Sequence, residues 1–214
     1  MRRKIVRNHL EHFMANNATT DHALDLGCGT ARYNSFFPNS LTLDISKRKG
    51  VDLVGDAHSL PFFGSSFSVV ISTEMLEHVR NPQLVIDEIQ RVLKPGGKLI
   101  LTTRFLFPIH DAPNDFFRFT KYGLAYLFRA WRNVNIVPDT KPFEAIGVLF
   151  QRMAFQSDFH ASRIVSGICL LAAQFLCLVN GLIRRQYGDY SRTVIESQVL
   201  TSGYYVVAQK TEAC

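Results

Sequence analysis

Cysteine is scarce in this sequence, and the four cysteines that occur stand far apart. Cys28, Cys169, Cys177 and Cys214 form no C-x-x-C pair and have no histidine partner at the spacing of a metal site. This pattern argues against a disulfide-rich scaffold and against a zinc module, so we expect no metal. It favours a reduced protein, which we expect in the cytoplasm.

Repeats and low-complexity tracts are absent as well. Only 20% of the residues are charged and 47% are hydrophobic, which indicates a globular chain with one domain over residues 1–214. The net charge of +6 comes partly from Arg2, Arg3, Lys4 and the cluster at 47–49. Such clusters attract anionic partners, or they are simply solvated surface. No nucleic-acid reader motif accompanies them, so we expect no nucleic-acid partner.

Short apolar segments alternate with helical patterns in the first half of the chain. The predicted strands cover residues 22–26, 41–44, 51–54, 67–73 and 98–103. Helices are predicted over residues 3–15, after the first strand, and from Asn81 to a stop signal at 94–97. This alternation predicts an α/β fold with a parallel sheet covered by helices on both faces. Ligands of such sheets bind beyond the carboxyl ends of the strands.

The first predicted strand ends in two closely spaced glycines, in the segment LDLGCGTAR. Gly27 and Gly29 have no Cβ, so a ligand can approach the backbone, and the amides of the short helix predicted to follow can face an anion. A merely tight turn is the alternative. A dinucleotide-binding turn would need a third glycine where Arg32 stands, which argues against an NAD-dependent reductase.

Acidic residues follow the second and third predicted strands. Asp44 stands where a carboxylate can accept hydrogen bonds from two ribose hydroxyls, and a cap or turn former is its alternative role. Asp56 and Ala57 follow the next strand, where a carboxylate can face an exocyclic amine. One acid at each successive strand end indicates a nucleoside that lies across this edge of the sheet.

Five segments in chain order carry a resemblance to a known family. They are LDLGCGTAR, LDIS, VDLVGDAHSLPF, FSVVISTEMLEHVRNP and VLKPGGKLILTTRF, and they cover most of residues 24–105. The chain resembles the class I S-adenosylmethionine-dependent methyltransferases, in the broad bacterial group (methyltransferase type 11) that includes the quinone-biosynthesis methyltransferases. The resemblance implies a Rossmann-like, seven-stranded, mostly parallel sheet with an antiparallel last strand. It also implies S-adenosyl-L-methionine as the cofactor and S-adenosyl-L-homocysteine as its product.

The resemblance assigns cofactor contacts to residues at four strand ends. These residues are Asp25, Gly27, Gly29, Asp44, Ile45, Asp56, Ala57, Thr73, Glu74 and Met75. It implies that the glycine turn holds the methionine part, that Asp44 binds the ribose and that Ile45 packs on the adenine. It further implies that Asp56 and Ala57 meet the adenine edge and that residues 73–75 close the pocket.

The segment FPIHDAPNDFFRFTKYGL follows the fifth predicted strand and contains the predicted catalytic residues. His110 and Asp111 are adjacent, and a titratable imidazole beside an acid can act as a base or clamp the acceptor. The structural alternative is an ion pair between Asp115 and Arg118, with Thr120 as a helix cap. Few catalytic residues are expected, because alignment of the acceptor supplies most of the acceleration of methyl transfer.

The segment STEMLEHV, at the end of the fourth predicted strand, carries two more titratable residues. His78 is predicted to be a hydrogen-bonded structural histidine, and Glu77 to help form the pocket or to begin the next helix. The segment lacks the Asn/Asp-Pro-Pro-aromatic run typical of DNA adenine methyltransferases, which argues against that activity.

The second half of the chain departs from a minimal methyltransferase. We predict an N-terminal helix at 1–20, a cofactor-binding core at 22–138, a mostly helical insertion at 139–202 and a last strand at 203–210. Residues 164–183 carry no charge and lie between Arg163 and Arg184. Three interpretations stay open for this segment: a buried or dimer-forming helix, a helix that caps the acceptor pocket or lies in the membrane interface, and a membrane-spanning helix.

These patterns predict a methyltransferase that acts on a small molecule, with O-methylation of a hydrophobic, lipid-linked or saccharide acceptor as the preferred reaction. A non-catalytic S-adenosylmethionine-binding partner or regulatory module is the alternative function. A homodimer and a peripheral membrane contact through residues 164–183 are further expectations.

Overall fold

The computed structural model describes residues 5–160, 162–196 and 199–212. Arg2, Arg3, Lys4 and Cys214, which the sequence analysis considered, lie outside the described residues. The chain forms two compact units, and the prediction of a single domain stays a prediction. The sheet unit comprises Glu11–Arg104, Ile109–Val137 and Tyr204–Cys214, and the helical unit comprises Met1–Leu10, Phe105–Pro108 and Pro138–Gly203.

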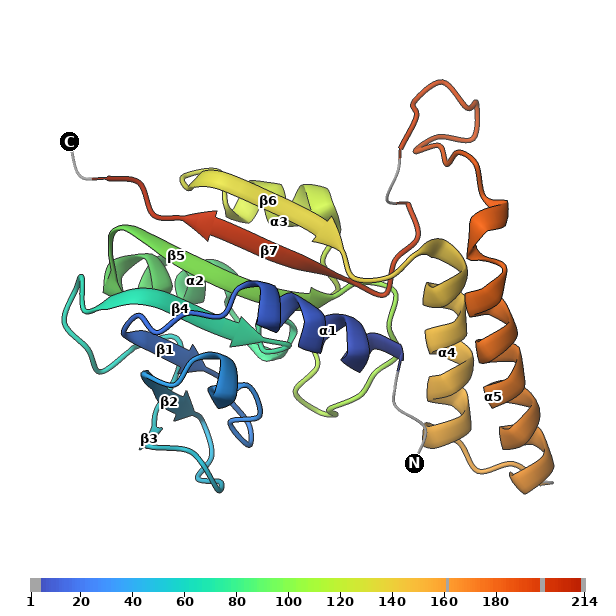
Figure 1. The fold of residues 1–214 in the computed structure, drawn as a ribbon, viewed down its shortest axis with the longest axis horizontal. Coiled ribbons are helices and arrows are strands. Elements are labelled where there is room, and N and C mark those ends of the chain that lie inside the picture. Colours follow the sequence, from blue (N-terminus) through green and yellow to red (C-terminus); the bar gives the residue numbers. More distant parts are fainter. Residues whose placement is uncertain (1–4, 161, 197–198, 213–214) are drawn as a thin grey trace. The chain divides into compact units, whose positions relative to one another are not determined.

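Within the described residues, seven strands form one sheet in the order β3-β2-β1-β4-β5-β7-β6 (Figure 1). The strands are β1 Ala23–Leu26, β2 Ser40–Asp44, β3 Leu53–Val54, β4 Phe67–Thr73, β5 Leu93–Arg104, β6 Arg132–Pro138 and β7 Gly203–Gln209. Strands β3, β2, β1, β4 and β5 pair in parallel. The N–H of Lys210, just after β7, donates to the carbonyl of Gly97 near the start of β5, so β7 runs antiparallel to β5. The predicted sheet, including its antiparallel last strand, is confirmed.

Helices cover both faces of the sheet, as predicted. The α-helices in the described part of the chain are α1 Ile5–Asn16, α2 Pro82–Val92, α3 Lys121–Leu127, α4 Pro142–Gln156 and α5 Ser162–Leu178. Helices α2 and α3 lie behind the sheet in Figure 1. On the opposite face, the ring of Phe13 in α1 stacks on Tyr205 of β7, with ring centroids 4.4 Å apart. Because both faces are covered, every residue of β1 is buried, which explains why this strand reads as a continuous apolar run around Asp25.

Helix α2 begins where the sequence predicts. The side chain of Asn81 accepts a hydrogen bond from the N–H of Leu84, and Pro82 occupies the first turn. The helix ends at Val92, and β5 begins at the next residue. The predicted stop signal at 94–97 therefore lies inside β5. This strand begins earlier than predicted because Leu93 already pairs with Phe67 and the N–H of Gly96 donates to the carbonyl of Lys210.

The helical unit contains two helices that pack along each other. A Cβ at Gly147 of α4 would lie 3.0 Å from the carbonyl oxygen of Ala173 in α5, so this glycine allows the two backbones to approach. Helix α5 ends at Leu178 and is followed by a 3-10 turn, η3 Asn180–Leu182, rather than continuing to residue 183 as predicted. Among the described residues, no helix is long and apolar enough to cross a membrane.

Candidate active site

The glycine turn, residues 27–31, follows β1 as an irregular turn and not as the start of a helix. Gly27, Gly29 and Ala31 all have positive φ, and a regular helix cannot pass through such residues. The predicted short helix is therefore wrong, and only a 3-10 turn follows, η1 Asn34–Phe36. The backbone amides of this turn are therefore loop amides and not helix amides.

The two glycines of the turn serve different purposes. A Cβ at Gly27 would collide with the side chain of Met75, 2.8 Å from its Cβ. At Gly29 nothing lies within 4 Å of the Cβ position. Gly27 thus permits close packing between the ends of β1 and β4, whereas Gly29 leaves open space beside its backbone.

Asp44, at the end of β2, connects that strand to the glycine turn. Its Oδ2 accepts a hydrogen bond of 2.9 Å from the N–H of Gly29, and its Oδ1 accepts one of 3.0 Å from the N–H of Ser46. The second bond is the turn-forming role that the sequence left open. Each oxygen of an ionised carboxylate can accept a further hydrogen bond. The ribose-binding role of Asp44 stays a prediction.

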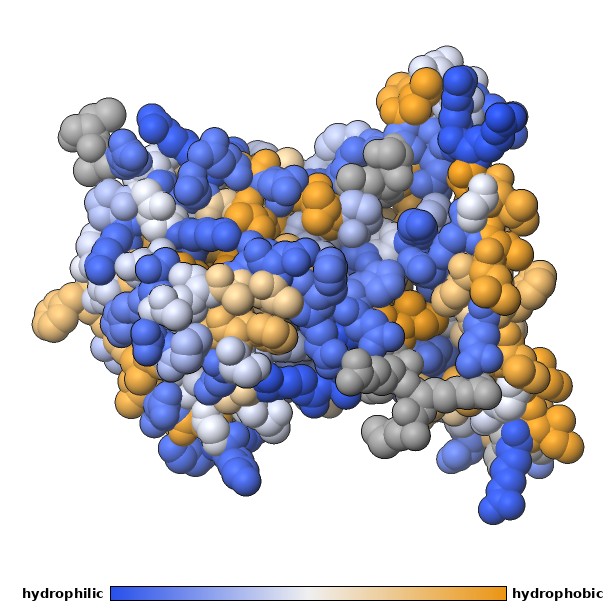
Figure 2. Space-filling model, in the orientation of Figure 1, coloured by the Kyte–Doolittle hydropathy of each residue, from blue (hydrophilic) through white to orange (hydrophobic). Residues whose placement is uncertain are grey.

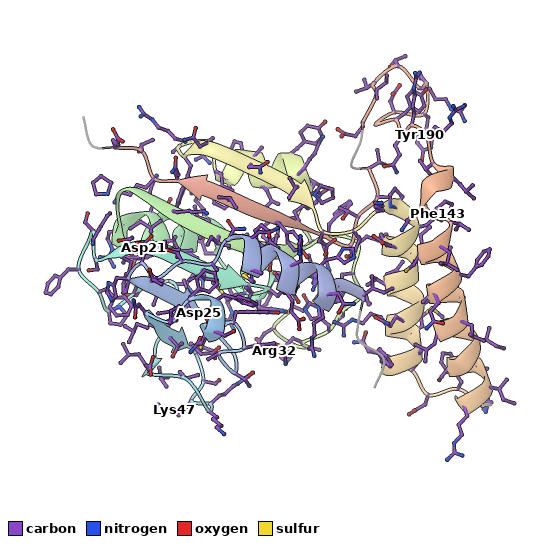
Figure 3. The ribbon with its side chains drawn as sticks, viewed as in Figure 1. Asp21, Asp25, Arg32, Lys47, Phe143 and Tyr190 are labelled. Atoms are coloured by element: carbon purple, nitrogen blue, oxygen red, sulfur yellow. The ribbon has the colours of Figure 1, made fainter. Side chains whose placement is uncertain are left out.

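Asp25 is a buried carboxylate in the middle of this region. It is 4% exposed, and its Oδ1 has no hydrogen-bond partner among the described residues. Burial and, to a smaller extent, the charge of Asp44 raise the pKa of Asp25 to about 7. Figure 3 shows Asp25 within the sheet layer and Lys47 at its outer edge. A cationic group next to Asp25 would satisfy its unpaired oxygen.

The residues predicted to bind adenine lie at the exposed ends of β2 and β3. Ile45 is 67% exposed, although it is a large apolar side chain. Asp56 accepts hydrogen bonds from the backbone and ring of His58, and these bonds lower the pKa of Asp56 and keep it ionised. Ala57 follows in the turn and is half-buried. Their adenine contacts stay predictions.

The end of β4 carries backbone strain next to the glycine turn. Glu74 has a φ of +52°, a conformation that costs a non-glycine residue about 1–3 kcal/mol. Its N–H donates to the carbonyl and the hydroxyl of Thr102, and its carboxylate forms an ion pair with Arg104. These bonds hold Thr73, Glu74 and Met75 beside Gly27, so the structure brings together two of the predicted cofactor segments.

The loop after β5 places His110 next to Asp115. Asp111 is exposed, whereas Asp115 Oδ2 accepts a hydrogen bond of 3.0 Å from the backbone N–H of His110 and lies 3.3 Å from its Nδ1. Arg118 donates to both oxygens of Asp115, at 2.6 and 2.7 Å. These bonds hold the pKa of Asp115 far below its usual range. The catalytic role predicted for His110 and Asp111 stays a prediction, and the acid that contacts His110 is Asp115.

The structural alternative for this loop is also present. The ion pair between Asp115 and Arg118 forms as described, and the Oγ1 of Thr120 accepts a hydrogen bond of 3.0 Å from the N–H of Gly123 at the start of α3. Asp115 therefore fixes the loop through Arg118 and also faces His110, and the catalytic role of His110 stays a prediction.

Two residues of the 3-10 turn η2 Leu76–His78 complete the group around His110. His78 Nε2 lies 3.2 Å from His110 Nε2. Glu77 is fully buried and accepts a hydrogen bond of 2.7 Å from Thr103 Oγ1, and its burial and the nearby charge of Glu74 raise the pKa of Glu77 to about 7. We call Glu77, His78, His110 and Asp115 the histidine cluster. Sequence reasoning did not join these residues because 32 positions separate the two histidines.

The first half of the chain is similar to a known protein family. A family model described as a methyltransferase domain matches residues 24–101. Residues 24–101 are a methyltransferase domain. The resemblance to the methyltransferases is therefore confirmed for these residues. The matched residues contain the glycine turn, Asp44 and the end of β4.

Two relatives align with more than half of this chain. A malonyl-[acyl-carrier protein] O-methyltransferase of Alcanivorax borkumensis is 30% identical over 163 residues, which is 67% of this chain and 50% of the relative. A demethylmenaquinone methyltransferase of Thermotoga maritima is 29% identical over 60% of this chain and 47% of its own length. The chain spans about half the length of the curated relatives it matches.

The fold also matches solved structures. A SAM-dependent methyltransferase of Thermotoga maritima superposes with a TM-score of 0.60 at 16% identity, over 97% of this chain and 92% of that one. Such a likeness shows the fold alone. The residues present fit the cofactor of the class: S-adenosylmethionine carries two cationic groups, and the structure offers the unpaired oxygen of Asp25 and the open space beside Gly29.

Proposed function

We propose that the chain transfers a methyl group from S-adenosylmethionine to an oxygen atom of a small hydrophobic, lipid-linked or saccharide acceptor. The bound cofactor supplies an electrophilic methyl group. One observation carries this proposal: the glycine turn and the histidine cluster both lie beyond the carboxyl ends of neighbouring parallel strands, β1, β4 and β5. The names of the malonyl-[acyl-carrier protein] O-methyltransferase relatives support oxygen as the target.

Four residues have defined tasks in holding the cofactor. Asp25 offers a buried negative charge to a cationic group, and Gly29 leaves its backbone accessible. Asp44, already oriented by two backbone amides, has lone pairs left for ribose hydroxyls. The exposed side chain of Ile45 covers one face of the adenine, which would remove an apolar surface from water.

Other predicted residues form two further sides of the proposed cofactor site. Asp56 stays ionised next to His58 and can accept a hydrogen bond from the adenine amine, with Ala57 against the ring. Thr73, Glu74 and Met75 close the opposite side, where the bonds of Glu74 to Thr102 and Arg104 hold the strained backbone in place. A fixed site of this kind aligns cofactor and acceptor, and alignment contributes on the order of 7–11 kcal/mol to catalysis.

The proton of the acceptor is handled at the histidine cluster. An ionised Asp115 beside Nδ1 favours the tautomer of His110 whose Nε2 carries a lone pair. Arg118 keeps Asp115 ionised, so the orientation of the imidazole does not depend on pH near neutrality. His110 thus keeps the predicted catalytic role, with Asp115 as its partner in place of Asp111.

A single assay tests the proposed function. The full chain is incubated with methyl-deuterated S-adenosylmethionine and a set of hydroxyl- or carboxyl-bearing lipids, quinols and saccharides, and mass spectrometry follows the label. We expect one labelled methyl group per acceptor, attached to oxygen, together with S-adenosylhomocysteine. Binding of S-adenosylhomocysteine without transfer to any acceptor would favour the non-catalytic module.

A membrane-proximal acceptor is supported by one face of the helical unit. Large apolar side chains recur every three or four residues along α5 and η3 and are 60–83% exposed; this α5 stripe consists of Ile164, Ile168, Leu171, Phe175, Leu178 and Leu182. Figure 2 shows hydrophobic side chains gathered over this helix. Residues 162–185 contain no acidic residue, and exposed Arg163, Arg184 and Arg185 flank the stripe. Such a face suits the interface of an anionic membrane.

Vesicle sedimentation tests this peripheral contact. We expect the full chain to sediment with vesicles that contain phosphatidylserine, and Leu171→Glu to weaken this binding about 10- to 100-fold, because burial of one leucine contributes roughly 1.5–3 kcal/mol. Gln174→Glu adds the same charge at an already polar, exposed position and serves as the control. A wild-type dimer in light scattering that Leu171→Glu dissociates, with no vesicle binding, would instead favour the homodimer.

A further inference from the structure

Three side chains of the histidine cluster converge in a way that methyl transfer alone does not require. Glu77, His78 and His110 each offer one ligand atom, and these atoms lie within 4.8 Å of one another. The two histidine Nε2 atoms are 3.2 Å apart. Two imidazole nitrogens bound to one tetrahedral metal ion are separated by a similar distance, because each Zn–N bond is about 2.0–2.1 Å long.

The outer nitrogens of both imidazoles face acceptors. His78 Nδ1 lies 2.6 Å from the carbonyl oxygen of Asn114, which can only accept, so this nitrogen carries the proton. His110 Nδ1 faces the ionised carboxylate of Asp115 at 3.3 Å. Metal-binding histidines typically direct their second N–H at a carbonyl or a carboxylate in this way, which fixes the ring and leaves a lone pair for the metal.

Glu77 provides a second, independent observation. It is fully buried, and its Oε2 accepts the hydrogen bond of Thr103. Its Oε1 is buried and has no hydrogen-bond partner among the described residues. A buried carboxylate oxygen without a partner is costly, and a cation held between Glu77 and the two imidazoles would satisfy it.

The nearby guanidinium groups bind other carboxylates. Arg104 forms its ion pair with Glu74, and Arg118 donates to both oxygens of Asp115. Glu77 forms no ion pair of its own among the described residues, although the charge of Arg104 acts on it, so its ionised carboxylate suits a cation.

From this geometry we propose that Glu77, His78 and His110 bind one divalent transition-metal ion. Two imidazoles and one carboxylate suit Zn²⁺ or Mn²⁺ better than Ca²⁺ or Mg²⁺, which prefer oxygen ligands alone. Three protein ligands leave a coordination position open, as in catalytic and not structural sites. If the proposed function holds, an acceptor hydroxyl takes that position, and the ion lowers its pKa so that its proton leaves to water. His110 then acts on the acceptor through the ion.

Metal content and affinity test the site without any activity measurement. The full chain is prepared without a histidine tag, stripped with a chelator and titrated with ZnCl₂ or MnCl₂ by calorimetry, with metal content counted by mass spectrometry. We expect one ion per chain. We expect Glu77→Gln and His110→Ala to weaken binding at least about 100-fold, and Asp115→Asn, which acts through His110, to weaken it about 10- to 100-fold.

Controls separate this site from general metal binding and from misfolding. His12→Ala removes an exposed histidine of α1 outside the cluster and is expected to leave affinity unchanged. Circular dichroism checks that each variant folds, and Glu77→Gln keeps the size of the buried side chain. Co²⁺ substitution is expected to give visible bands that Glu77→Gln shifts. Absence of stoichiometric metal, or equal affinity in wild type and both ligand variants, overturns the metal site. One bound ion without methyl transfer would contradict the proposed function alone.

Discussion

The glycine turn and the histidine cluster lie at the same edge of one sheet, yet they are built in different ways. The turn uses residues that are close in sequence, and its shape follows from Gly27 and Gly29, whose positive φ is visible to sequence reasoning. The cluster joins β4's end to a loop about 30 residues later, through the bonds of His110 with His78 and Asp115. Sequence motifs therefore point to the proposed cofactor site, whereas only the fold brings together the residues of the proposed acceptor site.

The largest expected effect is on turnover and distinguishes His110 from Asp111, which are adjacent in the loop after β5. His110→Ala is expected to lower turnover about 100- to 10,000-fold, the range for loss of a group that handles a proton, and to leave the affinity for S-adenosylhomocysteine unchanged. Asp111→Ala, with its exposed side chain, is expected to retain turnover. Kinetics and calorimetry on both variants check this contrast. Equal losses in the two variants would show that Asp111 takes part in the reaction together with His110.

On the cofactor side, Asp44→Ala is expected to weaken S-adenosylhomocysteine binding by about 1–3 kcal/mol, because the amides of Gly29 and Ser46 and the ribose hydroxyls lose their acceptor. Asp21→Ala is the matched control, since Asp21 is exposed and precedes β1 at the other end of the strand (Figure 3). Calorimetric titration measures both. Unchanged affinity in Asp44→Ala would remove the ribose assignment.

The raised pKa of Asp25 predicts that the stability of the folded chain depends on pH. Its folded pKa of about 7 lies above its unfolded value, so between about pH 4 and pH 7 the folded state keeps a proton that the unfolded state has released. Stability therefore falls as pH rises through this window. Glu77, with its pKa also raised to about 7, adds to this slope.

Thermal unfolding at pH 5 and at pH 7.5 checks this dependence. Asp25→Asn is expected to raise the melting temperature at pH 7.5 by about 2–4 °C, which corresponds to about 1 kcal/mol for a chain of this size, and to weaken binding of the cationic cofactor. If the melting temperature of Asp25→Asn changed with pH as much as that of the wild type, Asp25 would be ionised in the folded protein at both pH values.

The smallest expected effect is on stability and concerns Thr120, which caps helix α3. Thr120→Ala removes the hydrogen bond to the N–H of Gly123 and is expected to cost about 1 kcal/mol of unfolding free energy, the usual value of a helix cap. Turnover per folded molecule should stay the same. Denaturant unfolding and kinetics measure both quantities. A loss of turnover would mean that α3 positions the histidine cluster.

Sequence reasoning predicted the sheet because buried strands read as short apolar runs and Asn81–Pro82 marks a helix start. It was wrong about the helix after Gly29, since a positive φ at Ala31, a residue that usually avoids it, could not be foreseen. It also missed Asp115 as the partner of His110. The bend at Asp111 and the bonds from Phe116 and Phe117 to the carbonyl of Glu77 set the path of that loop, and these are contacts across the fold.

A crystal structure of the full chain with S-adenosylhomocysteine would test the central claim most directly. Our account predicts the ligand against Gly29, with its ribose on Asp44, its amino group toward Asp25 and its sulfur toward the histidine cluster. A ligand bound elsewhere, or one whose sulfur points away from His110, would contradict it.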